Sequence, residues 1–125
     1  MGWRMLVDSH GQATSGNTLC SAFALEHQLS IIAKDAVSLV FSPGKSAVIN
    51  PTGDDSLSTA GSGDILSGMI AGLIASGTSP SDAASIAPFI HGLCGEEAGK
   101  RNSATSVTAQ DILAAIPSVF CEVLS

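Results

Sequence analysis

A polar loop that runs directly into an apolar helix dominates the middle of the chain. Residues 50–64 read NPTGDDSLSTAGSGD and residues 65–76 read ILSGMIAGLIAS. The first stretch consists almost entirely of Gly, Ser, Thr, Asp and Pro, which is typical of a loop. The second is apolar on every side of a helix, which predicts a buried helix, and Gly77 is a natural residue to end it. The sequence therefore predicts a glycine-rich loop that opens into a helix N-terminus.

This junction has the chemistry of an anion site. The first N–H groups of a helix have no partner within it, and the helix dipole favours negative charge there. Gly61 and Gly63 lack a Cβ atom, so a phosphate group can approach the backbone N–H groups of residues 60–63. Asp64 stands where a carboxylate can accept the proton of a hydroxyl that attacks a phosphoryl group. The residues alone leave a second interpretation open, a connecting loop in which Asp64 merely favours the first helical turn.

Two common nucleotide-binding motifs do not fit this loop. A P-loop requires a Lys after its second Gly and a different spacing, and neither is present. The dinucleotide pattern G-x-G-x-x-G is also absent, because Gly61 and Gly63 are followed by Leu66 where the third glycine should stand.

The flanking sequence predicts an α/β pattern with few strands. Ala22, Leu25 and Leu29 share the apolar face expected of the first helix. The order of elements indicates part of a larger α/β fold. The expected elements of the first half are a helix from Ser15 to about Ser30, a strand over 31–33, and a hairpin over 36–50 with a type II turn at 42–45. Those of the second half are a helix that Ser79 caps and Gly99 ends, and a helix over 109–116. Thr108 and Asp111 repeat the start signal before this last helix, and Pro117 breaks or kinks it.

Composition limits the partners and the compartment. The 125 residues are 45% hydrophobic and 13% charged, which excludes a disordered chain. Five Lys and Arg against eleven Asp and Glu give a net charge of −6, so neither nucleic acid nor an anionic membrane surface is an expected partner. Residues 65–75, the longest apolar stretch, are too short to span a bilayer. Three cysteines without a C-x-x-C pair predict buried thiols in a reducing, cytoplasmic setting.

The run from Asn50 to Gly99 resembles the C-terminal half of the ADP/ATP-dependent NAD(P)H-hydrate dehydratases, which belong to the ribokinase-like superfamily. The Asn-Pro-Thr-Gly start, the loop length and the later His-Gly-Leu-x-Gly carry the resemblance. It implies a ribokinase-like three-layer αβα sandwich, here as a truncated C-terminal half. Residues 1–21 are an unassigned N-terminal segment, and residues 22–125 form the C-terminal portion of the dehydratase domain.

The resemblance also implies roles for individual residues. Asp64 matches the catalytic aspartate, which contacts the hydrated nicotinamide. His91 is a further candidate for substrate contact, against the alternative of a histidine that packs between helices. No residue is assigned to a metal. The implied nucleotide-binding residues are Lys34, Ser38, Thr59, Ala60, Gly61, Ser62 and Gly63.

The implied reaction is a repair. Hydrated NADH or NADPH is phosphorylated on its ring hydroxyl by ADP or ATP with Mg²⁺, and elimination of phosphate restores the dinucleotide. Because the family domain is about twice this length, turnover is expected to need a partner that supplies the missing half. An incomplete sheet leaves an unpaired edge and an exposed apolar face, which predict a homo-oligomer. Two alternatives stay open: a ribokinase-like small-molecule kinase, and a catalytically silent fragment that binds nucleotide or serves in association.

Two substitutions depart from the family pattern. Asp35 replaces a Gly, and a carboxylate beside bound phosphates is repulsive by about 1 kcal/mol at ~4 Å in water. Ala60 also replaces a usual Gly, which is a milder change.

Overall fold

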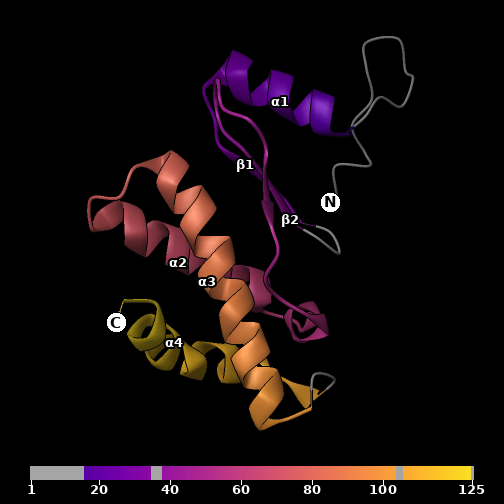
Figure 1. Ribbon diagram of the computed structural model, residues 1–125, viewed down its shortest axis with the longest axis vertical. Helices are drawn as coiled ribbons and strands as arrows, with labels where there is room; N and C mark the ends of the chain where they lie inside the picture. Colours follow the sequence, from indigo (N-terminus) through magenta and orange to yellow (C-terminus); the bar gives the residue numbers. More distant parts are fainter. Residues whose placement is uncertain (1–15, 35–37, 104–105, 125) are drawn as a thin grey trace. The chain divides into compact units, whose positions relative to one another are not determined.

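A computed structural model describes residues 16–34, 38–103 and 106–124 (Figure 1). The chain divides into two compact units between Asn50 and Pro51. Asp35, the first departure from the family pattern, lies outside the described residues. The elements are, in order, α1 (Gly16–His27), β1 (Ile31–Ala33), β2 (Ser38–Phe41), β3 (Val48–Asn50), the 3₁₀ turn η2 (Asp55–Ser58), α2 (Ser62–Ala75), α3 (Pro80–Arg101) and α4 (Ala109–Leu124).

The first unit contains one helix and an antiparallel sheet of three strands in the order β1-β2-β3. Ile31 pairs with Phe41, and Leu39 pairs with Ile49. The predicted hairpin is confirmed, although its second strand begins at Val48 and not at Ser46 as expected. Gly44 has the positive φ (69°) that the third position of a type II turn requires, and the N–H of Lys45 donates to the Ser42 carbonyl at 3.1 Å.

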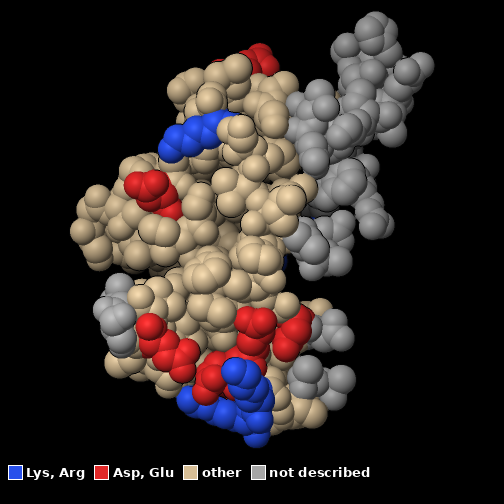
Figure 2. Space-filling model, viewed as in Figure 1, with Lys and Arg blue, Asp and Glu red and all other residues tan. Residues whose placement is uncertain are grey.

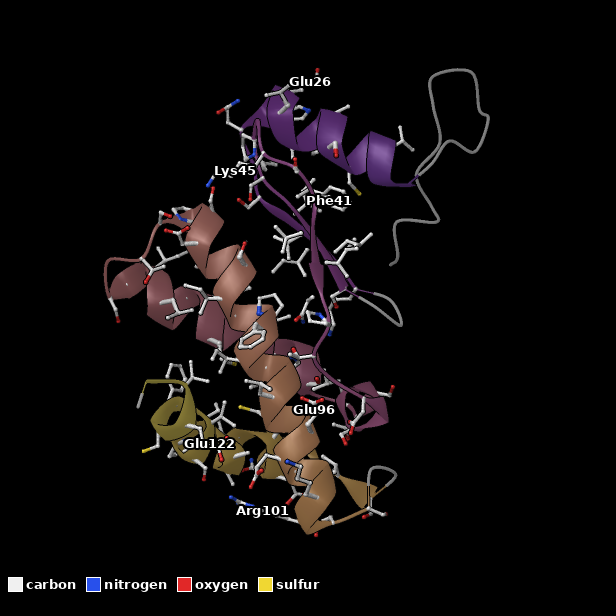
Figure 3. All side chains as sticks on the ribbon, in the orientation of Figure 1. Glu26, Phe41, Lys45, Glu96, Arg101 and Glu122 are labelled. Carbon is white, nitrogen blue, oxygen red and sulfur yellow. The ribbon has the colours of Figure 1, made fainter. Side chains whose placement is uncertain are left out.

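The core of this unit is built from small residues around one aromatic ring. Phe41 of β2 packs with Cys20, Ala24 and Ala33 (Figure 3). The apolar face expected for α1 is wrong: Leu25 is 56% exposed, whereas Ala24 is fully buried. Small side chains let the helix backbone approach the sheet closely, so they and not the larger leucine line the contact.

The second unit is a layer of three helices. Its core joins α3 to α4 through Ile90, Cys94, Ala98, Val107, Ile112, Ala115 and Val119. Cys20 and Cys94 are buried, as expected, but Cys121 on α4 is exposed. The expectation that all three thiols are buried is therefore wrong for Cys121, which follows the last core position of its helix.

The capping signals of this unit are confirmed. Ser79 Oγ accepts the N–H of Asp82 at 3.2 Å, with Pro80 in the first helical position. At the start of α4, Asp111 Oδ2 accepts the N–H of Thr108 at 2.8 Å, and Thr108 Oγ1 accepts the N–H of Asp111 at 3.3 Å. This reciprocal pair satisfies N–H groups that the helix itself leaves without partners.

Two expected helix ends are wrong. Gly99 does not end α3, because it keeps a helical φ and the helix continues to Arg101, where the N–H of Asn102 still donates to the Ala98 carbonyl at 3.0 Å. Pro117 does not end α4, which continues to Leu124. A proline removes one helical hydrogen bond, and the packing of α4 against α3 offsets that loss.

The expected burial of α2 is also wrong. Only Ser62 and Leu66 of this helix are buried, and Ile74 is 43% exposed. The helix contacts α3 along one side, while its other apolar residues lie along a pocket beside α4. Gly77 ends the helix as expected, with φ 103° and its N–H bonded to the Ile74 carbonyl at 3.0 Å.

None of the helices in the described part of the chain combines the length and apolar character needed to cross a bilayer.

Candidate functional site

The start of α2 leaves two backbone N–H groups available to a ligand. The first helical hydrogen bond runs from the N–H of Ile65 to the Gly61 carbonyl at 3.2 Å. The N–H groups of Gly63 and Asp64 precede that bond, so they have no acceptor within the helix. Both residues are exposed. The combination can bind an anion, because the positive end of the helix dipole points at the same place.

The residue before the helix requires glycine. Gly61 caps α2 with φ 90°, in the left-handed region that residues with a Cβ rarely adopt. A Cβ added there would also lie 3.1 Å from the Ala109 Cβ on α4. The loop therefore turns sharply into the helix, and the backbone stays uncovered where a phosphate would approach.

Thr59 and Ala60 form the turn that precedes this cap. The N–H of Ser62 donates to the Thr59 carbonyl at 3.3 Å, so this N–H is already used inside the loop. Ala60 is exposed beside Gly61. The sequence predicts that the N–H groups of residues 60–63 bind phosphate. Among them, the N–H of Gly63 has no acceptor in the helix. The N–H of Asp64, which lies outside the predicted set, also has none there.

Asp64 is placed to act as an acceptor of protons. Its side chain is exposed in the first turn of α2 and forms no hydrogen bond or ion pair within the described residues. It also stands at the edge of an apolar pocket of about 720 Å³ between α2 and α4. The pocket is lined by Asp64, Ile65, Gly68, Met69, Gly72, Leu73, Ser76, Leu113, Ile116 and Phe120.

A close contact with α3 supports the loop. Thr52 Oγ1 donates to the Phe89 carbonyl at 3.0 Å. A Cβ on Gly92 would lie 2.7 Å from the Thr52 carbonyl carbon, and a Cβ on Gly95 would lie 2.6 Å from Leu57 Cδ2. The Asn-Pro-Thr-Gly segment and the His-Gly-Leu-x-Gly segment are thus two sides of one contact.

This contact is what the sequence reasoning missed. Thr52, Gly92 and Gly95 have structural roles that the sequence did not assign. The signal was present, since two glycines three residues apart lie on the same face of a helix. What they pack against could not be read from that spacing.

His91 is buried directly beneath the junction. It is 2% exposed, and its Nε2 lies 3.1 Å from Oγ of Ser62, which is 1% exposed. The sequence proposed His91 as a residue near the substrate. The structure places its ring behind the first residue of α2, with almost no surface open to solvent.

The remaining nucleotide-binding candidates belong to the first unit. Lys34 is exposed directly after β1, and Ser38 is the half-buried first residue of β2. Lys34 and Ser38 therefore belong to one compact unit, and the junction at Asp64 belongs to the other.

A cluster of charged side chains lies near the C-terminal ends of α3 and α4. Glu96, Glu97, Lys100, Arg101 and Glu122 lie on the last turns of α3 and α4 (Figures 2 and 3). Arg101 Nη2 bonds to Glu97 Oε1 at 3.4 Å and to Ser118 Oγ at 3.2 Å. Lys100 and Arg101 are the basic residues of this unit's sequence, so negative charge at the junction is met by backbone N–H groups.

The donor set at the junction suits phosphate better than a metal held by protein ligands alone. Among the described residues, no group of three or more His, Cys, Asp and Glu could hold a metal ion. Mg²⁺ in phosphoryl-transfer sites is commonly held by one or two carboxylates together with the phosphates themselves. The N–H groups of Gly63 and Asp64 fit that arrangement, because the phosphates that they would bind could themselves supply ligands to Mg²⁺.

Comparisons with known proteins agree on one family. A sequence profile described as NAD(P)H-hydrate dehydratase matches residues 3–118. The chain is 37% identical over 101 residues to a bifunctional NAD(P)H-hydrate repair enzyme of Moorella thermoacetica, covering 81% of this chain and 19% of that protein. It is 33% identical over 113 residues to an ADP-dependent (S)-NAD(P)H-hydrate dehydratase of Cenarchaeum symbiosum, covering 90% and 37%.

A solved structure shares the fold. The crystal structure of the ADP/ATP-dependent NAD(P)H-hydrate dehydratase of Bacillus subtilis, co-crystallised with ATP and Mg²⁺, matches with a TM-score of 0.78 and 28% identity. The match covers 85% of this chain and 38% of that protein. The chain therefore spans between about a fifth and two fifths of the length of these relatives.

Proposed function

Because this chain belongs to the NAD(P)H-hydrate dehydratase family, we propose that it carries the phosphate-binding half-site of a repair enzyme for hydrated NADH and NADPH. Its fold is the C-terminal half of the ribokinase-like α/β fold. One observation carries the proposal: Gly61, with φ 90°, leaves the N–H groups of Gly63 and Asp64 open beside an exposed carboxylate.

Each part of this junction has one task in the proposed reaction. Asp64 accepts the proton of the ring hydroxyl as its oxygen attacks the terminal phosphoryl group of ADP or ATP. The bond from this ring oxygen to phosphorus forms while the bond from phosphorus to the departing nucleotide breaks. Later loss of phosphate, together with a proton from the adjacent ring carbon, restores the ring double bond. The N–H groups of Gly63 and Asp64 stabilise the phosphoryl oxygens. Bound Mg²⁺ would supply further neutralisation of the phosphate charge.

Lys34 and Ser38 are proposed to contact the nucleotide from the first unit. Lys34 offers a positive charge on an exposed side chain, and Ser38 offers a hydroxyl. Asp35 stands between them in the sequence, and its negative charge would weaken binding of phosphates.

We further propose that turnover requires the rest of the dehydratase domain, because a second copy of this half would repeat the same residues and supply none of the missing ones. The chain covers 38% of the Bacillus subtilis enzyme. The pocket between α2 and α4 supports the proposal because it is apolar and open. Gly68 and Gly72 line it, and a Cβ on either residue would meet nothing within 4 Å, so close packing inside this chain does not explain them.

The compartment proposed for this activity is the cytoplasm. Cys20 and Cys94 are free, buried thiols, and thiols persist in a reducing environment.

The direct test measures nucleotide binding and turnover separately. Millimolar ADP or ATP with Mg²⁺ should raise the thermal unfolding midpoint of the chain. At a ligand concentration one hundred times Kd, binding should add about 2.7 kcal/mol to the free energy of unfolding. Hydrated NADH should be converted when the N-terminal half of a relative's dehydratase domain is added. A stable phosphorylated product would instead identify a kinase. A cooperative transition unmoved by nucleotide would support the silent association fragment.

Asp64→Asn tests the proton acceptor. Loss of the carboxylate should lower turnover by about 10²- to 10⁴-fold and leave nucleotide binding nearly unchanged. Asp82→Asn is the matched control, because Asp82 is also an exposed third residue of a helix. Equal turnover in the two variants would contradict the role of Asp64.

A further inference from the structure

His91 is a buried titratable group that the proposed chemistry does not use. It lies on α3, and its ring reaches the first residue of α2, where Nε2 and Ser62 Oγ are 3.1 Å apart. Both side chains are at most 2% exposed. Because a buried polar group is costly to leave without a partner, this bond is a specific link between α3 and the junction.

Ser62 passes this restraint directly to the groups proposed to bind phosphate. Its N–H is bonded to the Thr59 carbonyl at 3.3 Å, and the residue before it accepts the first helical bond. Its side chain points into the protein, whereas the next two residues, Gly63 and Asp64, are exposed. A movement of Ser62 therefore moves the N–H groups and the carboxylate together.

We propose that His91 is a positioning residue, which holds Ser62 and thereby orients the N–H groups of Gly63 and Asp64 toward the phosphate. The inference rests on the proposed function for the nature of the anion. The restraint on the first turn of α2 concerns this chain alone.

Two substitutions of His91 test its two ring nitrogens independently. His91→Gln keeps a nitrogen close to the position of Nε2, so it preserves the bond to Ser62. His91→Asn keeps a polar atom near Nδ1 and loses that bond. Ser62→Ala removes the other partner, and in a double variant with His91→Asn the two losses should not add. Ser79→Ala is the stability control, because it removes a capping bond of α3 at a position far along the chain from the junction.

The first measurement is amide hydrogen exchange by NMR, which needs no ligand. His91→Asn and Ser62→Ala should speed exchange at Ile65 and Leu66 relative to the core amides of α4, whereas His91→Gln and Ser79→Ala should not. The second is the affinity for ADP and ATP with Mg²⁺ by calorimetry. His91→Asn and Ser62→Ala should weaken it by about two- to tenfold.

The outcomes are distinguishable. If His91→Gln behaves like His91→Asn, or if Ser62→Ala changes no more than Ser79→Ala, the positioning role is wrong. If the unchanged chain binds neither nucleotide, the proposed function fails, and the exchange pattern alone decides whether His91 positions the first turn.

Discussion

Gly92 on α3 and Gly68 on α2 differ in the space around them, so substitution by alanine should change the stability of the chain in opposite directions. Gly92 lies against the backbone of Thr52, so it permits the loop to lie on α3. Gly68, in the interior of α2, meets nothing that a Cβ would disturb. The same residue type is thus required at one position and, for the stability of this chain alone, unfavourable at the other.

Gly92→Ala should destabilise the second unit strongly. The new Cβ would lie 2.7 Å from the Thr52 carbonyl carbon, which cannot move without displacing the loop. Overpacking of this kind costs about 1–3 kcal/mol. Gly68→Ala is the matched control and should raise the free energy of unfolding by about 0.4–1 kcal/mol. Urea denaturation checks both, and similar midpoints for the two variants would contradict the contact.

The three cysteines should react with thiol reagents at different rates. Burial raises the pKa of Cys94 from 9.0 to about 11 and also raises the pKa of Cys20. Cys121 is exposed. A thiol reagent at pH 8 should therefore label one cysteine of the folded chain quickly and the other two only after unfolding. Fast labelling of Cys94, located by mass spectrometry, would show that α3 and α4 open readily.

Stability should also fall at high pH. Between pH 9 and about 11 the folded chain keeps the Cys94 proton that the unfolded chain releases. The unfolded state then binds fewer protons, so the free energy of unfolding decreases as pH rises through this interval. Cys94→Ala should flatten the decline, and denaturation midpoints measured from pH 8 to 11 would show whether it does.

At the level of elements, capping residues located the helix starts better than helix breakers located the ends. Ser79 and Thr108 form the hydrogen bonds that their positions predict. These bonds are local, so sequence specifies them. Gly99 and Pro117 did not stop their helices, because packing between α3 and α4 outweighs a loss of about 1 kcal/mol for a glycine and about 3 kcal/mol for a proline.

Pro117→Ala should stabilise the chain. Pro117 is exposed within α4, so an alanine there would restore a backbone N–H without leaving a cavity, with a gain of about 1–3 kcal/mol. Pro88→Ala offers the contrast, because Pro88 is buried within α3 and its loss would leave a void that offsets the gain. Thermal midpoints that rank Pro88→Ala above Pro117→Ala would contradict this account.

At the level of the whole molecule, the second unit has its own core but leaves α2 only partly covered. Ile74 of α2 is 43% exposed, and Leu113 of the neighbouring α4 is 48% exposed. Apolar surface of this kind is favourable to bury. When the 125-residue chain is studied by itself, further copies of it can bury this surface.

The chain should therefore self-associate through the pocket between α2 and α4. Leu113→Asp places a charge in the pocket and should weaken association more than tenfold, since a buried leucine contributes about 1.5–3 kcal/mol. Ile86→Asp is the matched control, because Ile86 is 41% exposed on α3 and does not line the pocket. Sedimentation equilibrium over a range of concentrations is the measurement, and a monomer throughout would contradict the prediction.

The sequence by itself determined the order of the elements, the helix caps, the hairpin turn and the place of the glycine-rich junction before α2. These features depend on residues a few positions apart, whose chemistry is visible in the order of the chain. The family also followed from local motifs, and the comparisons confirmed it.

Only the tertiary structure decided that Thr52 lies on Gly92, that His91 bonds to Ser62, and that α2 is largely uncovered. Each of these depends on which surfaces meet. Residues 29 or more positions apart come together there through packing, and the periodicity of a single helix states that a face is apolar without stating what covers it.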